Sequence, residues 1–318
     1  MASRYAIAPL DLSKLETYPL ASRKSKVSAQ QIGKPAAPGG SFREFWQSLP
    51  DILAGRDLRE LVSRMKSARE SERAILWGLG AHVIKVGLSP LLVDLMERGY
   101  VQGLALNGAG IIHDFEMALV GETSEEVSES LGAGKFGMAE ETGSLLNRAI
   151  NEGVGAGLGL GESVGAFLAD LSPPHQKLSL LANAYRLAIP VTVHVAVGTD
   201  IIHMHPQASG EAIGKGSLLD FRLFASLARG LDGGGVYLNF GSAVVLPEVF
   251  LKAVSVVRNL GYPLTDFSTA NFDFIRHYRP RVNVVQRPTS AGGEGYMLTG
   301  HHELMVPLLV WGVLGELG

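Results

Sequence analysis

Short apolar runs alternate with helix-like segments along most of this chain, and this alternation limits the fold more than any other feature. In the clearest unit, the apolar run 74–79 precedes a helix-like stretch between Ser89 and Gly99. Ser89 can cap that helix, Pro90 suits its first turn, and Gly99 can end it. A chain that repeats strand and helix in this order forms a parallel sheet with helices on both faces. The sequence therefore predicts an α/β fold.

The same pattern continues toward the C-terminus and indicates at least four parallel strands. The apolar stretch 304–315 reads as a buried helix. Further strands are predicted at 101–106, 191–197, 236–240 and 282–285, with helices at 217–229 and 247–259.

The N-terminal part has a different character. Residues 31–41 contain three glycines and two prolines, a composition typical of a linker. We therefore expect residues 1–45 to be an N-terminal arm that lies on the body or reaches a neighbouring subunit. Residues 46–318 are expected to form a single α/β domain, a size within the range of such domains.

Composition narrows the possible partners and sites. The chain has no cysteine, which excludes disulfides, thiolate zinc sites and cysteine nucleophiles, so a metal site would need His, Asp or Glu. Lys and Arg number 28 against 31 Asp and Glu, which argues against nucleic acid as a partner. The stretch 304–315 contains Pro307 and falls short of the ~20 residues needed to cross a bilayer. Because the N-terminus also lacks a signal-peptide pattern, we expect a cytoplasmic protein with no membrane partner.

Two local motifs have structural interpretations. Thr123 to Glu126 fits a capping box, which predicts a helix starting there. Glycines alternate with other residues between Gly153 and Gly161, but without the spacing of a dinucleotide loop. Close helix packing or a flexible lid explains them better than a phosphate site.

Parallel sheets bind ligands beyond the carboxyl ends of their strands, where the chain turns into the next helix. In this sequence those turns carry glycines, which let the backbone approach a cofactor, and histidines close by. The turns are Gly80 to Gly87, Asn107 to Asp114, Gly198 to His205, and Gly241 to Ala243.

The order and spacing of these segments resemble the deoxyhypusine synthase family of NAD-dependent, Rossmann-like enzymes. The likeness spans roughly residues 70–315 and includes the Asn107–Gly110 turn, Thr199–Asp200 and the Phe240–Ser242 turn. It implies a Rossmann-like parallel sheet, a homo-oligomer (dimer or tetramer) and NAD as a cofactor. The NAD contacts that it implies are Gly80, Ala81, Gly87, Asn107, Gly108, Ala109, Gly110, Gly241 and Ser242.

The chain departs from the family at the catalytic lysine. The synthases form an imine with a lysine shortly before their final strand, whereas residues 287–296 here contain no lysine. An imine needs a primary amine, so the covalent step of that family cannot run through this segment. Leu246-Pro247 also stands where the family has Lys-His. The sequence therefore predicts chemistry other than aminobutyl transfer.

Histidines give an independent indication of a site. The resemblance matches acidic positions of the family to His113-Asp114 and to Asp200. Several histidines follow predicted strands and would suit acid–base chemistry or a His/carboxylate metal site. His205 and His301-His302 lie in similar positions, whereas Lys85 and Lys215 are interpreted as solvated lysines. The candidate catalytic residues are His113, Asp114, His194, Asp200 and His203.

Three functional hypotheses remain open on these grounds. The first is NAD-linked oxidation of a small amine or hydroxyl, with a histidine as base. The second is a His/carboxylate metal-dependent hydrolase or lyase. The third is a homologue without catalysis that binds a nucleotide or metabolite. All three expect a small-molecule ligand, with an amine as the candidate substrate of the first.

Overall fold

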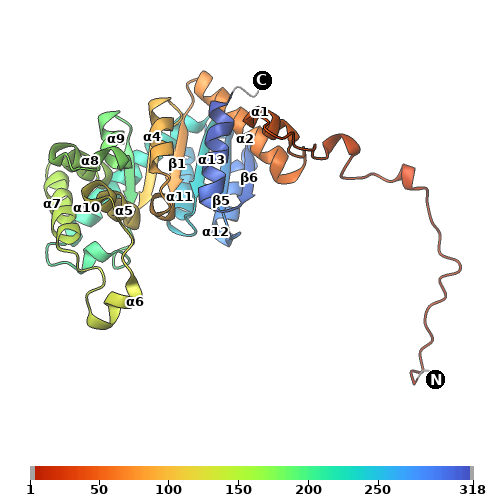
Figure 1. The fold of residues 1–318 in the computed structure, drawn as a ribbon, viewed down its shortest axis with the longest axis horizontal. Coiled ribbons are helices and arrows are strands. Elements are labelled where there is room, and N and C mark those ends of the chain that lie inside the picture. Colours follow the sequence, from red (N-terminus) through yellow and green to blue (C-terminus); the bar gives the residue numbers. More distant parts are fainter. Residues whose placement is uncertain (1–3, 316–318) are drawn as a thin grey trace.

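The computed structural model describes residues 4–315, and its centre is a parallel sheet. The sheet has six strands in the order β3-β2-β1-β4-β5-β6, and every neighbouring pair is parallel. This is the doubly wound order in which the chain changes direction between β1 and β4. The predicted Rossmann-like α/β fold is therefore confirmed (Figure 1). The strands are β1 (Ile75–Leu79), β2 (Gly103–Asn107), β3 (Val191–His194), β4 (Gly235–Phe240), β5 (Phe267–Asp273) and β6 (Glu294–Thr299).

Helices cover both faces of this sheet. Trp77 and Leu79 of β1 belong to one buried core, and Leu76 belongs to the other, because successive side chains of a strand point to opposite faces. The first core includes α2, α4, α5 and α13, and the second includes α10, α11 and a π-helical turn. The helices are α1 (Phe42–Ser48), α2 (Leu53–Glu70), α3 (His82–Lys85), α4 (Ser89–Glu97), α5 (Gly108–Val120), α6 (Val127–Ser130), α7 (Glu140–Gly155), α8 (Leu160–Leu171), α9 (Leu180–Arg186), α10 (Gly210–Ala228), α11 (Val245–Asn259), α12 (Tyr278–Pro280), the π-helical turn Arg281–Gln286 and α13 (His302–Leu314).

The prediction of a strand at 282–285 was wrong. These residues form part of the π-helical turn, and Val284 is buried in the core beside α11. A short apolar run fits a buried helix as well as a buried strand, so its period could not decide between them. The strands that complete the sheet are β5 and β6, on either side of this turn.

Three further boundaries differ from the sequence predictions. The strand predicted at 191–197 ends at His194, and α10 begins at Gly210 rather than 217, capped by the Ser209 hydroxyl. Lys215 therefore lies within α10. The Thr123 capping box was also wrong: α6 begins at Val127 with Glu126 as its cap.

The alternating glycines lie where α7 meets α8. A Cβ at Gly153 would lie 2.2 Å from the Ser163 hydroxyl, and one at Gly161 would lie 2.0 Å from the carbonyl oxygen of Val191. These distances are far below normal contact, so glycine is required where α7 packs on α8 at Gly153 and where α8 packs on β3 at Gly161. The helix-packing interpretation agrees with the structure.

The N-terminal arm extends away from the body up to α1, as Figure 1 shows. Helix α1 itself packs on the body, because Trp46 is buried and the Phe42 ring lies 5.3 Å from that of Trp311 in α13. The predicted boundary between residues 45 and 46 thus falls inside α1.

Over residues 4–315, no single helix is both long and apolar enough to span a bilayer. Helices α7 and α8 together have the required length and composition, but they are bent by 115° at their junction.

Candidate functional site

A cavity of about 510 Å³ opens at the carboxyl ends of β1, β2 and β3. Its walls come from α3, α5, the loop after β3, and the segment 122–139, which projects from the body around α6 in Figure 1. This is the edge at which parallel sheets bind ligands. The lining residues are Lys85, Ala109, Ile112, His113, Glu116, Glu122, Thr123, Ser124, Glu125, Val127, Phe136, Ala139, Thr199, Asp200 and Ile201.

His113 is held in this wall by a short chain of hydrogen bonds. The Thr123 hydroxyl donates to Oε2 of Glu116 at 2.5 Å and lies 2.7 Å from Nδ1 of His113. Because the hydroxyl proton goes to Glu116, Thr123 accepts from His113, so Nδ1 carries the ring proton. Thr142 of α7 donates to the other Glu116 oxygen at 3.1 Å and fixes that carboxylate. The lone pair of Nε2 is left to act as a base.

The surroundings keep His113 neutral. Burial, together with the positive charge of Lys85, lowers the pKa of His113 to about 4. Its side chain remains 17% exposed, so a ligand in the cavity can reach it. At neutral pH the imidazole is therefore unprotonated, and its Nε2 lone pair is free.

Asp200 supplies a second carboxylate to the cavity, beside the start of α5. The residue is buried, and its Oδ2 atom has no hydrogen-bond partner among the described residues. Burial raises the pKa of Asp200, while the neighbouring His203 opposes that shift. A buried acceptor without a partner favours a ligand that brings a hydrogen-bond donor.

The cavity is acidic overall. Among the lining residues of the described chain, Lys85 is the only lysine or arginine, whereas four are carboxylates. An excess of carboxylates in a recessed site attracts cations. The carboxylates are Glu116, Glu122, Glu125 and Asp200.

Asp114 does not reach the cavity. It is fully buried on another side of α5, where it accepts from the Ser179 hydroxyl (2.5 Å) and from the amides of Leu180 (2.6 Å) and Leu181 (3.2 Å). Burial raises the pKa of Asp114 to about 6, against these hydrogen bonds. Asp114 therefore holds the start of α9 and does not orient an imidazole.

His194 also lies away from the cavity. Its Nε2 is 3.0 Å from the Thr192 hydroxyl, and its ring meets the edge of Phe224 of α10, on the α10/α11 face of the sheet. Burial alone lowers the pKa of His194 to about 4.

His203 and His205 brace the loop that carries Asp200. Nδ1 of His203 accepts from the amides of Gly198 (3.1 Å) and Asp200 (3.3 Å). His205 packs against Gly143 of α7, and its Nε2 lies 2.9 Å from the carbonyl oxygen of Gly137. These histidines thus support the cavity wall from behind.

His301 and His302 form a separate group at the ends of β1, β5 and β6. The His302 ring lies 5.6 Å from that of His82, and His301 is stacked on Phe274 at 5.8 Å. His302 is buried, with Nε2 3.2 Å from the carbonyl oxygen of Phe272. The histidines therefore divide into distinct groups and do not converge on one ligand position.

Most of the glycines predicted to contact NAD are packed against the chain itself. A Cβ at Gly80 would lie 2.5 Å from the carbonyl oxygen of Gly241, and one at Gly241 would lie 2.6 Å from the His302 ring. At Gly108 it would lie 2.0 Å from Oδ2 of Asp200, which occupies the start of α5. Gly80 is therefore closed by the backbone of the Gly241 turn, whereas Gly108 and Gly241 fit a phosphate on this side only if Asp200 or His302 moves. By contrast, Gly87 faces open space, and Ala109 lines the cavity.

The polar residues predicted beside these glycines cap helices. The Asn107 side chain accepts from the amide of Gly110, and the Ser242 hydroxyl accepts from the amide of Leu246. A Cβ at Gly110 would lie 3.2 Å from Leu106, so Gly110 packs on the strand before it. Ala81 precedes α3 and is half-buried.

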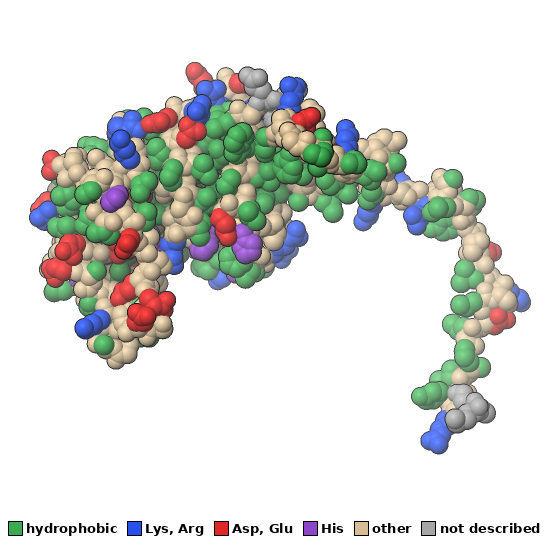
Figure 2. Space-filling view, viewed as in Figure 1, with side chains coloured by type: hydrophobic (Ala, Val, Ile, Leu, Met, Phe, Trp, Pro, Cys, Tyr) green, Lys and Arg blue, Asp and Glu red, His purple; other side chains and the backbone are tan. Residues whose placement is uncertain are grey.

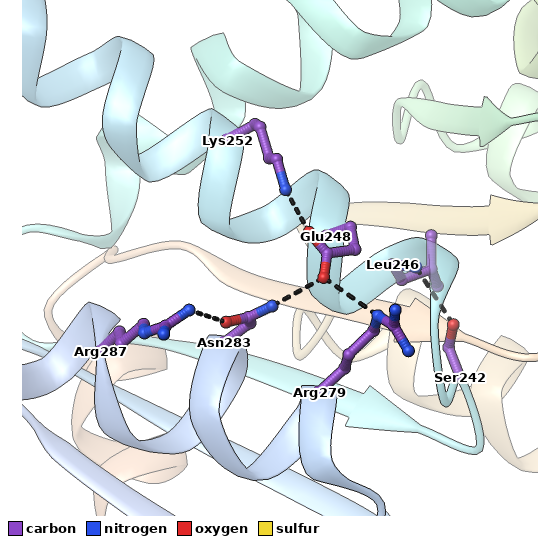
Figure 3. A network of polar contacts seen from close by, with 7 residues as sticks. All are labelled: Ser242, Leu246, Glu248, Lys252, Arg279, Asn283 and Arg287. Atoms are coloured by element: carbon purple, nitrogen blue, oxygen red, sulfur yellow. Dashed lines mark hydrogen bonds and ion pairs between the residues drawn. The ribbon is translucent and has the colours of Figure 1, made fainter.

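Helix α11, which follows β4, is tied to the π-helical turn by a polar network (Figure 3). Glu248 of α11 accepts from Asn283 at 2.9 Å, pairs with Arg279 at 3.2 Å, and also pairs with Lys252. Arg287 donates to Asn283 at 2.9 Å and extends the network. The network thus holds α11 against α12 and the π-helical turn, while Ser242 accepts from the first turn of α11.

The metal-site hypothesis lacks a ligand set in the described part of the chain. Within residues 4–315, no three His, Asp or Glu side chains come together in an arrangement that could hold a metal ion.

Sequence reasoning missed Glu116, Thr123 and Thr142. Glu116 lies three residues after His113, a spacing that places both on one face of a helix, so this partner could have been found. Thr123 and Thr142 come from the segment after α5 and from α7, and their approach depends on the fold.

No protein-family model matches the chain, and no curated protein matches it in sequence. Solved structures nevertheless share its fold. A LOR/SDH protein from Methanococcus maripaludis S2 superposes with a TM-score of 0.51 and 15% identity, over 81% of this chain and 68% of that one. AgrE, solved with ornithine and NAD+, superposes with a TM-score of 0.53 and 14% identity, over 80% of this chain and 32% of AgrE.

A protein described as a deoxyhypusine synthase from Entamoeba histolytica has a TM-score of 0.52 and 12% identity, over 89% of this chain and 96% of that one. This chain therefore spans about a third of the length of AgrE and nearly all of the synthase. At these identities the likeness establishes the fold alone. The chain has the Rossmann-like fold that these proteins share.

Proposed function

We propose that this chain is an enzyme that binds a small cationic amine in the cavity and takes a proton from it with His113. The proposal rests on one observation: Thr123 links the His113 ring to Glu116, which assigns the ring proton to Nδ1. An imidazole that is neutral at pH 7, with a fixed tautomer and a free Nε2 lone pair, can accept a proton from the ligand.

The charges of the cavity support an amine as the ligand. Asp200 has an unpartnered, buried carboxylate oxygen, which an ammonium group would satisfy. Glu122 and Glu125 add negative charge at the rim. A phosphate or carboxylate in the cavity would meet repulsion from the same groups, so the phosphates of NAD+ would have to lie outside it.

NAD is the cofactor that we propose from the fold, since AgrE, which shares it, was solved with NAD+. Bound NAD+ would supply a hydride acceptor and make the reaction an oxidation of an amine or hydroxyl. Because His302 covers Gly241, NAD binding at that turn would require the His302 side chain to move. Asp200, which pairs with the amine in this proposal, stays over Gly108, so the phosphates of NAD+ would not use the start of α5.

Titration calorimetry with a panel of alkyl monoamines and diamines tests the ligand class. We expect Asp200→Asn to weaken amine binding about tenfold or more, because it removes the charge that pairs with the ammonium. Asp170→Asn, an exposed position on α8, is the matched control and should leave binding unchanged. Equal binding of amines and of uncharged analogues would overturn the ligand class.

Turnover separates an enzyme from a protein that only binds. With NAD+ and a bound amine, we expect NADH fluorescence to rise, and His113→Gln to slow it by about 10²- to 10⁴-fold without loss of amine binding. Amine binding with no turnover would favour the metabolite-binding hypothesis. Thermal stabilisation by NAD+ tests the cofactor independently, because saturation at about 100 times the dissociation constant adds about 2.7 kcal/mol.

A further inference from the structure

We propose that the N-terminal arm, residues 4–41, docks on the outer face of α13 in a second copy of this chain. This outer face consists of Leu304, Leu308 and Trp311. The inference concerns assembly and does not depend on the proposed function of the cavity.

The arm is exposed and rich in large apolar side chains. Every residue from 4 to 30 is exposed, and the arm runs away from the body in Figures 1 and 2. Single exposed apolar residues are common, but a long row of them marks an interaction site. The exposed fractions are 83% for Ile7, 88% for Leu10, 65% for Leu12, 61% for Leu15, 68% for Tyr18, 72% for Leu20 and 55% for Val27.

Helix α13 presents a second apolar surface. From Leu304 to Leu314 it contains no charged residue, yet Leu304 is 67% exposed and Trp311 is 59% exposed. Spacings of four and three residues place Leu304, Leu308 and Trp311 on one face. Leu308 is half-buried at the border with the core, and Phe42 of α1 contacts one side of the Trp311 ring. The opposite side of α13, at Val306 and Val310, is already buried in the core. A helix that is apolar on all sides normally lies in an interior, so a partner is needed for the outer face.

The root of the arm directs it away from its own α13. The amide of Lys34 donates to the carbonyl oxygen of Ser48, and the amide of Asp51 donates to that of Gln31, both at 2.9 Å. Residues 31–34 therefore run antiparallel to 48–51. To reach the α13 of its own chain, the arm would have to reverse direction or break the hydrogen bonds between residues 31–34 and 48–51. A second copy of the chain is therefore the favoured partner.

The surfaces lie where a symmetric pair can exchange arms. Phe42, the first residue of α1 after the arm, contacts Trp311, so the root of each arm borders the α13 face of its own chain. If two copies meet around α13, the root of each arm lies close to the partner's α13. In a dimer with twofold symmetry, each arm can then bind the α13 of the other copy.

Charge also favours exchange. The stretch 1–34 has six Lys or Arg and two Asp or Glu, a formal charge of +4 in a chain of −3, which leaves −7 on the remainder. A basic arm is attracted to an acidic partner body, which speeds and orients association.

Single-cysteine variants of the full chain test this directly, because the chain has no cysteine of its own. A mixture of Leu12→Cys and Leu308→Cys chains, treated with a bismaleimide, should give a product of twice the chain mass that joins these two positions. Leu12→Cys mixed with Lys252→Cys, on α11 and on the other face of the sheet, is the control and should give little product. A double variant that cross-links only within one chain would overturn the proposal.

Sedimentation of the full chain gives the second readout. We expect a dimer, and Leu10→Asp/Leu12→Asp should raise its dissociation constant at least tenfold. Thr17→Asp/Ser25→Asp adds the same charge at exposed polar positions of the arm and should have a smaller effect. A monomer at all concentrations, or equal effects of both double variants, would contradict docking through the apolar side chains.

Discussion

Nδ1 of His113 lies 2.7 Å from the hydroxyl oxygen of Thr123, the contact that joins α5 to the segment over the cavity. The cavity wall and the base are thereby coupled, since Thr123 belongs to the segment 122–139 while His113 belongs to α5. Opening of that segment would free the His113 ring as well as the cavity.

Thr123→Val should disturb the hydrogen bonding of His113 while keeping the shape of the side chain at position 123. Valine lacks the hydroxyl that accepts from Nδ1 and donates to Glu116, so the preference for one tautomer should weaken and turnover should fall about tenfold. Nitrogen NMR of the His113 ring reads the tautomer directly. Thr142→Val, which removes a bond to Glu116 alone, should change the spectrum less; equal effects would argue against the hydrogen-bonded chain.

Gly241→Ala and Gly87→Ala form a matched pair. Both glycines have positive φ, +66° and +78°, but only an alanine at Gly241 would clash with a neighbour, the His302 ring. We expect Gly87→Ala to cost about 1 kcal/mol of unfolding free energy from backbone strain, and Gly241→Ala to cost about 1–3 kcal/mol more from overpacking. Urea unfolding measures both, and equal losses would show that His302 yields freely.

His194 should make the protein less stable in acid. Its pKa is about 4 in the folded chain against a usual value of 6.5, so the folded state binds fewer protons between those values. The contribution of neutral His194 to the free energy of unfolding is full above pH 6.5, and it falls by about 3 kcal/mol as the pH drops to 4. His194→Gln should flatten that fall in urea unfolding, whereas His175→Gln, at an exposed position, should leave it as it is.

Glu248→Ala should loosen the π-helical turn. It removes the acceptor of Asn283 and the partner of Arg279, and hydrogen exchange should rise over residues 279–287. Because Glu248 is partly exposed, we expect a loss of only about 1 kcal/mol. Lys252→Ala removes the exposed pair alone and serves as the control; a rise of exchange equal to that of Glu248→Ala would rule out the role of Asn283.

The helix-flanked strands β1 to β4 could be predicted because their apolar runs are continuous. Strand β5 could not, since its sequence Phe-Ser-Thr-Ala-Asn-Phe-Asp is largely polar although every residue is buried. Its polar side chains find partners only in the fold: Thr269 donates to the carbonyl oxygen of Val284, and Asn271 accepts from Asn239 of β4. Sequence pattern alone gives no sign of these partners.

The sequence predicts that the site lies at the strand ends, but it does not predict which of the candidate residues there face the cavity. His113 and Asp200 do line one cavity, as their positions after β2 and β3 suggest. Asp114, next to His113, points elsewhere because adjacent residues of a helix lie about 100° apart around its axis. Which of two neighbours faces a cavity depends on the packing of α5, which no local pattern records.

That division of α5 has a mechanical consequence. His113 contacts the segment over the cavity, while Asp114 holds the Ser179 hydroxyl and the first amides of α9. The base and the start of α9 are thus attached to the same turn of one helix. A shift of this turn of α5 relative to the sheet would therefore strain the contact at Thr123 and the contacts at the start of α9 together.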